Sequence, residues 1–121
     1  MWFFADTYAL IEFFLGNLHY EKYFNEHEFV TTRLNLLELY YAKLAEGQPE
    51  LAEEYFNSLL PKTVEIEDEI LKRAANFKVE NKKQNISYID AIGYEIAKER
   101  KIKFLTGDKA FKEMQNVEFV K

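Results

Sequence analysis

Apolar residues follow two alternating patterns along the chain, short continuous runs and longer stretches with helical spacing. The run Trp2–Ala5 predicts a strand that is buried on both faces, and Phe29–Thr31 and Ile102–Leu105 predict two more strands. Thr63–Ile66 alternates as a half-exposed edge strand does, and Val117–Val120 predicts a last strand near the C-terminus. The pattern therefore predicts about five strands.

Between these runs, apolar residues recur at three- and four-residue spacings, which predicts helices. The helices are expected from Asp6-Thr7 to about Leu15, then over Tyr20–Asn25, Arg33–Ala45, Pro49 to about Leu59, Asp68–Val79 and Tyr88–Arg100, with a short one after Asp108. Strands that alternate with helices predict a parallel sheet with helices on both faces. We therefore expect residues 1–121 to form a single three-layer α/β/α domain.

Composition narrows the class of protein. The 121 residues fit one domain, and 48% hydrophobic and 17% aromatic residues are enough for a real core. The absence of cysteine excludes disulfides, thiolate metal sites and cysteine catalysis. No apolar stretch reaches the ~18 residues of a membrane span, and the N-terminus has no basic leader, so we expect a cytosolic protein with no membrane partner.

The net charge of −5, taken alone, argues against a nucleic-acid partner, because phosphate contacts need Lys and Arg. The sixteen basic residues are not evenly spread, however. They gather at Lys78–Lys83 and at Lys98–Lys103. Each cluster can be read as a solvated surface or as a basic rim that binds a phosphodiester, and the sequence leaves both readings open.

Four acidic residues stand out by their positions. Asp6 and Asp108 follow predicted strands closely, and parallel sheets place their active crevice beyond the carboxyl ends of the strands. Glu38 and Asp90 lie on or beside the apolar stripes of helices, and small residues such as Gly93 leave room for a ligand near Asp90. Four converging carboxylates would repel one another unless a cation neutralised them.

Each acid also has an ordinary explanation. Asp6 and Asp108 could be the N-caps of the helices that follow them. Asp90 fits a capping box with Ser87, and Glu38 would fit one if its helix began late. Their conjunction favours a site, because four acids lie at element ends or on helix stripes and two of them are aimed at one crevice.

These segments resemble the PIN domain family, specifically the small VapC-type toxin ribonucleases of toxin–antitoxin pairs. The resemblance covers the whole chain. It is carried by the strand that ends in Asp6-Thr7, by Leu36–Ala42 around Glu38, by Ser87–Ala91 around Asp90, and by the Thr106-Gly107-Asp108 turn within Phe104–Phe111. The chain departs from the family at Tyr8, where Asn or Ser is common, and at Ile92-Gly93-Tyr94, where further Ala is usual.

The resemblance implies an endoribonuclease that depends on Mg²⁺ or Mn²⁺, with Asp6, Glu38, Asp90 and Asp108 as catalytic residues. Hard oxygen ligands without a His or Cys cluster suit these two ions. Asp6 and Asp90 would be the principal metal ligands, and Asp108 would bind directly or through water. Glu38 would complete the cluster or orient the attacking water.

Three further residues are candidates for substrate binding. Thr106 could hydrogen-bond a carboxylate or the scissile phosphate, or it could only satisfy the backbone of its turn. Lys82 and Lys83 precede the helix that carries Asp90, and we expect them to hold RNA backbone.

The family also implies a homodimer and an antitoxin whose segment wraps the toxin and reaches the site. A cluster of aromatic residues is expected to leave an exposed patch that would serve as a dimer or partner surface. Its members are Phe13, Phe14, Tyr20, Tyr23 and Phe24. Two alternatives stay open, a non-catalytic PIN-like interaction module and an RNA-processing PIN nuclease without an antitoxin.

Overall fold

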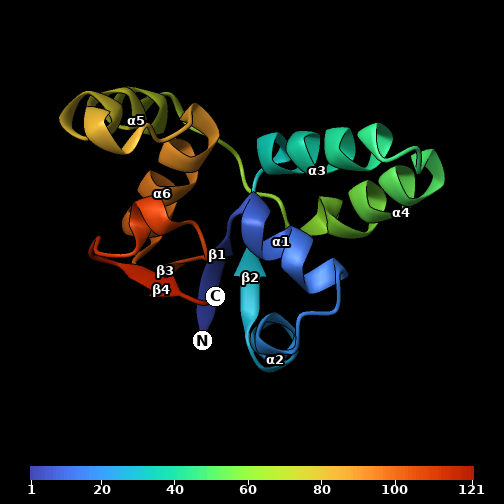
Figure 1. Cartoon of the computed structure of the whole chain (residues 1–121). Coiled ribbons are helices and arrows are strands. Elements are labelled where there is room, and N and C mark those ends of the chain that lie inside the picture. The colour runs from blue at the N-terminus through green and yellow to red at the C-terminus, as the bar shows by residue number, and fades with distance from the viewer.

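The computed structural model describes residues 1–121 and forms an α/β/α domain around one parallel sheet (Figure 1). The strands are β1 (Trp2–Ala5), β2 (Glu28–Val30), β3 (Lys103–Thr106) and β4 (Val117–Phe119). They lie in the order β2-β1-β3-β4, and every neighbouring pair is parallel. The predicted fold class is therefore confirmed, with four strands rather than five.

The predicted edge strand Thr63–Ile66 is wrong. Thr63 makes a single isolated bridge with Thr31, and the chain does not continue along β2. The segment leaves a 3-10 turn, η1 (Leu60–Lys62), and reaches the next helix only a few residues later. Val64 and Ile66 are half-buried against the core, so their alternation reflects the packing of a connecting segment and not of a strand.

The helices lie close to the predicted ranges, and none of them is long and apolar enough to cross a membrane. They are α1 (Thr7–Phe14), α2 (Leu18–Glu26), α3 (Arg33–Ala45), α4 (Pro49–Leu59), α5 (Asp68–Glu80) and α6 (Tyr88–Arg100), with two more 3-10 turns at η2 (Lys82–Gln84) and η3 (Lys109–Phe111). Side-chain caps fix the starts of α1, α3 and α6, at Asp6, Thr32 and Ser87 respectively.

Alternation along the strands divides the core into two layers. Phe4 and Phe104 point to the face covered by α5 and α6, whereas Phe3 and Leu105 point to the face covered by α1 to α4 (Figure 1). A Cβ on Gly93 would lie 2.5 Å from Cε1 of Phe4, so α6 approaches β1 closely at this glycine. The expectation that Gly93 leaves room for a ligand is therefore wrong, because the position is filled by the core.

The expectation that the five residues of the aromatic cluster are not all buried is confirmed, although none of them is fully exposed. Tyr20 is fully buried, and its hydroxyl donates a hydrogen bond to the backbone oxygen of Val120. The other four members are half-buried and pack on one another or on the core, as in the stacked pair Phe13–Phe24 with ring centroids 4.4 Å apart. Leu15 and Leu18, which follow Phe13 and Phe14 in the sequence, are exposed, and so are Leu37, Tyr41 and Leu44 on α3.

Candidate active site

The site lies at the point where the strand order of the sheet reverses, between β1 and β3. The chain moves from β1 to β2 on one side and then returns to place β3 on the other side of β1. Parallel sheets bind ligands outside the carboxyl ends of the strands at such a reversal. Asp6 follows β1 directly, and Asp108 follows β3 after one glycine, so both acids stand at this point.

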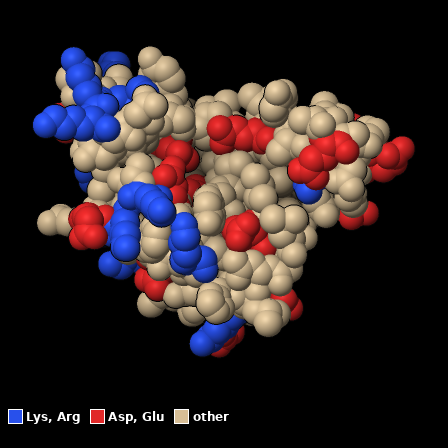
Figure 2. Space-filling view, in the orientation of Figure 1, with Lys and Arg blue, Asp and Glu red and all other residues tan.

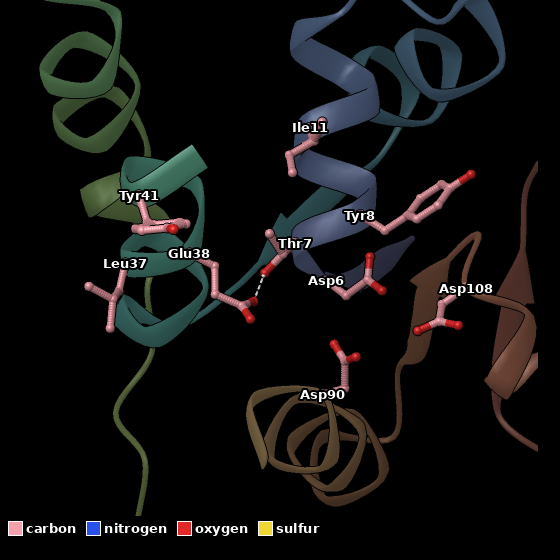
Figure 3. A pocket seen from close by; sticks show the side chains of 9 residues that line it. All are labelled: Asp6, Thr7, Tyr8, Ile11, Leu37, Glu38, Tyr41, Asp90 and Asp108. Atoms are coloured by element: carbon pink, nitrogen blue, oxygen red, sulfur yellow. Dashed lines mark hydrogen bonds between the residues drawn. The ribbon is translucent and has the colours of Figure 1, made fainter. Parts of the chain in front are cut away.

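The four acids line one cavity of about 680 Å³. Glu38 comes from α3 on one face of the sheet and Asp90 from α6 on the other, so the cavity joins the two helical layers (Figure 3). Figure 2 shows acidic side chains in the hollow between the layers. The remaining lining residues are Thr7, Tyr8, Ile11, Leu37 and Tyr41.

Asp6 is buried, with 1% of its surface exposed, and both carboxylate oxygens are engaged. Oδ1 accepts the Ala9 N–H at 2.8 Å, as an N-cap does, and Oδ2 accepts the Thr106 hydroxyl. The Thr106 oxygen in turn accepts the Asp108 N–H at 3.0 Å. Thr106 thus makes both the carboxylate contact and the turn contact, and it lies beneath the acids rather than in the cavity lining.

The capping explanations hold only in part. Asp108 caps η3 by accepting the Ala110 N–H at 3.0 Å. Ser87 caps α6 by accepting the Asp90 N–H at 3.1 Å, but the Ser87 backbone N–H donates no hydrogen bond to the Asp90 carboxylate, so the capping box is incomplete. Helix α3 begins at Arg33, which places Glu38 in its second turn, beyond any cap. Glu38 is therefore not explained by helix capping, whereas a hydrogen bond from the Ser87 side chain acts to lower the pKa of Asp90.

A chain of buried and partly buried hydrogen bonds holds Glu38. The Thr32 hydroxyl donates to Asn35 Oδ1 at 2.7 Å, and Asn35 Nδ2 donates to Thr7 Oγ1 at 3.1 Å. The Thr7 hydroxyl then donates to Oε1 of Glu38 (Figure 3). The sequence reasoning missed Thr7 and Asn35. A signal was available, because Asn35 stands between Leu34 and Leu36 in the apolar stripe of α3.

Charge repulsion between the carboxyl groups that line the cavity adds to the effect of burial on the pKa of Asp6 and of Asp90. Burial raises the pKa of Asp6 well above its ordinary value, with Asp90 and Asp108 adding to the effect, although the hydrogen bonds from Thr106 and Ala9 act against it. Burial also raises the pKa of Asp90 to about 6, and repulsion from Glu38 and Asp108 contributes. None of the three ion pairs in the structure includes one of these acids.

The donor set fits a hard divalent cation, because it consists of carboxylate oxygens without His or Cys. No group of three or more His, Cys, Asp or Glu side chains is already gathered so that it could hold an ion. The candidate ligands by position are Asp6, Asp90 and Asp108, with Glu38 on the α3 side of the cavity.

The predicted lysines do not line the acidic cavity. Lys82 and Lys83 are exposed on η2, and Lys82 lines a second cavity between α5 and the start of α6. The structure therefore brings the four acids together and leaves both lysines outside their cavity.

A model of the PIN domain family matches residues 3–117, so the chain belongs to the PIN domain family. The resemblance drawn from the acidic motifs is thereby confirmed. A comparison with curated protein sequences found no significant match.

The fold is similar to that of chains in solved toxin–antitoxin complexes. A chain of a toxin–antitoxin complex from Klebsiella pneumoniae matches with a TM-score of 0.76 and 18% identity, over 95% of this chain and 94% of that chain. VapBC2 from Rickettsia felis bound to a promoter DNA fragment matches with a TM-score of 0.72 and 15% identity, over 99% of this chain and 98% of that chain. VapBC-1 from nontypeable Haemophilus influenzae matches with a TM-score of 0.71 and 15% identity, over 99% of this chain and 97% of that chain.

Proposed function

We propose that this protein is a Mg²⁺- or Mn²⁺-dependent endoribonuclease that acts in the cytoplasm as the toxin of a type II toxin–antitoxin pair. The observation that carries the proposal is the convergence of Asp6, Glu38, Asp90 and Asp108 on one cavity without a cationic partner. Membership of the PIN domain family supports nuclease chemistry. The likeness to chains of VapBC complexes supports the toxin role.

Asp6, Asp90 and Asp108 would hold the metal. A divalent ion held by these residues would lower the pKa of water and offset the charge that develops on a phosphodiester. The hydrogen bonds from Ala9 and Thr106 fix the Asp6 carboxylate in one orientation, and each oxygen keeps a further lone pair for a ligand.

Glu38 is suited to accept a proton from the attacking water. Its Oε1 accepts the Thr7 hydroxyl, whereas Oε2 has no partner in the protein. Because Asn35 donates to Thr7, the hydroxyl proton of Thr7 is directed at Glu38 and the carboxylate acts as an acceptor. A general base must lie within hydrogen-bond reach of the proton that it removes, and a fixed side chain meets that condition best.

The test is cleavage of labelled single-stranded RNA by purified protein in Mn²⁺, in Mg²⁺ and in EDTA. We expect cleavage with either ion and none in EDTA. Asp6→Asn and Asp90→Asn should each lose activity by about a hundredfold or more while their circular dichroism stays unchanged. Glu113→Gln, which removes an exposed carboxylate, is the matched control. An active, folded Asp6→Asn variant would remove Asp6 from the ligand set.

A partner protein is supported by the apolar wall of the same cavity. Tyr41 is 70% exposed and Leu37 57% exposed, and both lie beside the acids with Ile11. A partner segment with apolar side chains would match the apolar wall, and one basic side chain on it would match the carboxylates. Co-purification with the product of the neighbouring reading frame, lost in Leu37→Asp, would support an antitoxin. A neighbouring frame whose product does not bind would favour an RNA-processing nuclease.

The same exposed wall favours the second candidate, a non-catalytic interaction module. Thermal unfolding with increasing Mn²⁺ separates the two, because a ligand that binds only the folded state stabilises it by mass action. An increase in melting temperature in millimolar Mn²⁺ supports the metal site, and no increase supports the module. The homodimer, also proposed by likeness to the family, is tested by light scattering of the purified protein.

A further inference from the structure

We propose that the cavity between α5, η2 and the first turn of α6 is a subsite for single-stranded RNA, in which a base stacks on Tyr88 and a phosphate contacts Lys82. This second cavity has a volume of about 340 Å³ and is separate from the acidic one. The proposal rests on the proposed ribonuclease function and deepens it, because it assigns how the substrate is held.

Without a bound cation, the side chains of the acidic cavity do not attract RNA by charge. Its lining contains four carboxylates and no Lys or Arg, and the whole chain carries a net charge of −5. A phosphodiester chain is repelled by such a surface, and affinity for nucleic acid comes largely from basic residues on the backbone. Positive contacts must therefore come from a neighbouring surface. Figure 2 shows Lys and Arg gathered over α5 and over the β3–β4 side of the molecule.

The second cavity supplies such contacts. Lys78 and Lys82 line it together with the amide side chains of Asn81 and Asn85. Neither lysine belongs to an ion pair, so neither charge is neutralised by a carboxylate. Lys82 is exposed on η2 and is free to meet a phosphate. The Asn81 Nδ2 donates to the Phe77 carbonyl at 2.9 Å, which leaves its Oδ1 available to the edge of a base.

Tyr88 has the properties of a stacking surface. It is 68% exposed, so it contributes little to the core. The Lys78 ammonium nevertheless lies 4.3 Å from the centre of its ring and donates a hydrogen bond to the Ile86 carbonyl. The Lys78 ammonium, held by the Ile86 carbonyl, thus covers one face of the Tyr88 ring. The exposed surface of Tyr88 is the part of the ring that the ammonium does not cover. Aromatic rings presented in this way stack bases of any sequence.

The position of Tyr88 connects the two cavities. Tyr88 is the first residue of α6 and Asp90 lies in the same turn. Successive helical residues are rotated by about 100°, so the two side chains project to nearly opposite sides of the helix. A strand that crosses the N-terminal end of α6 therefore meets the carboxylates on one side and the Tyr88 cavity on the other. One nucleotide near the scissile bond would be fixed by this contact.

The test is binding of a short, fluorescein-labelled single-stranded RNA of mixed sequence, measured by anisotropy in EDTA so that no cleavage occurs. Tyr88→Leu should weaken binding on the order of tenfold, whereas Tyr88→Phe keeps the ring and should bind as the wild type does. Lys82→Gln should lower the slope of log affinity against log salt by roughly 0.7, the value for one phosphate of a single strand. Lys22→Gln on α2, far from this cavity, is the charge-matched control.

Equal affinity of the wild type and Tyr88→Leu would overturn the subsite, and so would a wild type that does not bind single-stranded RNA. These results are distinct from a failure of the proposed function. A protein that binds RNA through Tyr88 but does not cleave it in Mn²⁺ retains the subsite and loses the nuclease. Metal-dependent cleavage with the same rate and affinity in Tyr88→Leu retains the nuclease and loses the subsite.

Discussion

The hydroxyl of Thr106 donates a hydrogen bond to the carboxylate of Asp6, which is 100 residues away in the sequence. This bond joins the ends of the two central strands. It also favours the charged form of Asp6 and so partly offsets the burial that raises its pKa. The bond therefore bears on both the folding of the sheet and the proposed binding of a cation by Asp6.

Replacing Thr106 by Val should weaken the affinity for Mn²⁺ by roughly tenfold or more. Without the hydroxyl, the pKa of Asp6 rises further, and a proton competes better with the metal at neutral pH. The unfolding free energy should also fall by about 1–3 kcal/mol, because a buried acceptor loses its partner. Mn²⁺ titration by calorimetry measures the first effect and urea unfolding the second. Thr106→Ser keeps the hydroxyl, and weak Mn²⁺ binding in this variant would argue against the explanation.

Replacing Thr7 by Val should reduce the rate of RNA cleavage more than the affinity for Mn²⁺. Glu38 loses the hydroxyl that orients it, while the candidate ligands Asp6, Asp90 and Asp108 keep their contacts. The buried Asn35 amide also loses its acceptor, at a cost of about 1–3 kcal/mol in unfolding free energy. Single-turnover cleavage at saturating Mn²⁺ measures the rate. If Mn²⁺ affinity falls as steeply as the rate, Thr7 supports the metal ligands and not only Glu38.

Replacing Gly107 by Ala should destabilise the protein by about 1–3 kcal/mol. The new Cβ would lie 2.3 Å from Cε1 of Tyr8 and 2.5 Å from the backbone oxygen of Val120. The ring can move, but the backbone oxygen belongs to the end of the sheet. Adding Tyr8→Ala should therefore restore only part of the lost stability in urea unfolding. Full recovery in the double variant would mean that the ring was the only obstacle.

The metal-free protein should lose stability as the pH rises through about 6, because of Asp90. Its pKa is raised from 3.8 to about 6, so the folded state binds this proton more tightly than the unfolded state does. The stabilisation is present at low pH and is lost as the carboxyl ionises. In EDTA, the melting temperature of Asp90→Asn should match that of the wild type near pH 4, exceed it increasingly as the pH rises to about 6, and keep the same excess above that pH. A difference between Asp90→Asn and the wild type that stays the same at every pH would contradict the assignment.

Topology made Asp6 and Asp108 predictable from the sequence. Both follow apolar strands, and a parallel sheet brings the carboxyl ends of its strands to one edge. The surroundings of Glu38 and Asp90 were harder to predict. The sequence pattern of a helix shows on which face a residue lies, but not which element packs against that face. Their meeting depends on how α3 and α6 pack on opposite sides of the sheet, which no local pattern specifies.

The errors have a common origin in tertiary packing. Thr63–Ile66 alternates as a strand does, yet its apolar residues fill the core beneath α5 without a strand to pair with. Gly93 is small because Phe4 approaches it, and not because a ligand does. The support of Glu38 by Thr7 and Asn35 was missed since each contact crosses between elements.

The strand order also determines at which stage of folding the acidic cavity can form. β3 lies between β1 and β4, so the carboxyl ends that carry Asp6 and Asp108 come together only after a late segment of the chain has inserted beside the first strand. Until that insertion, the acids from the two helical layers have no common edge on which to meet. The proposed nuclease activity would therefore arise only after β3 has joined β1, and a nascent polypeptide that ends before β3 would lack it.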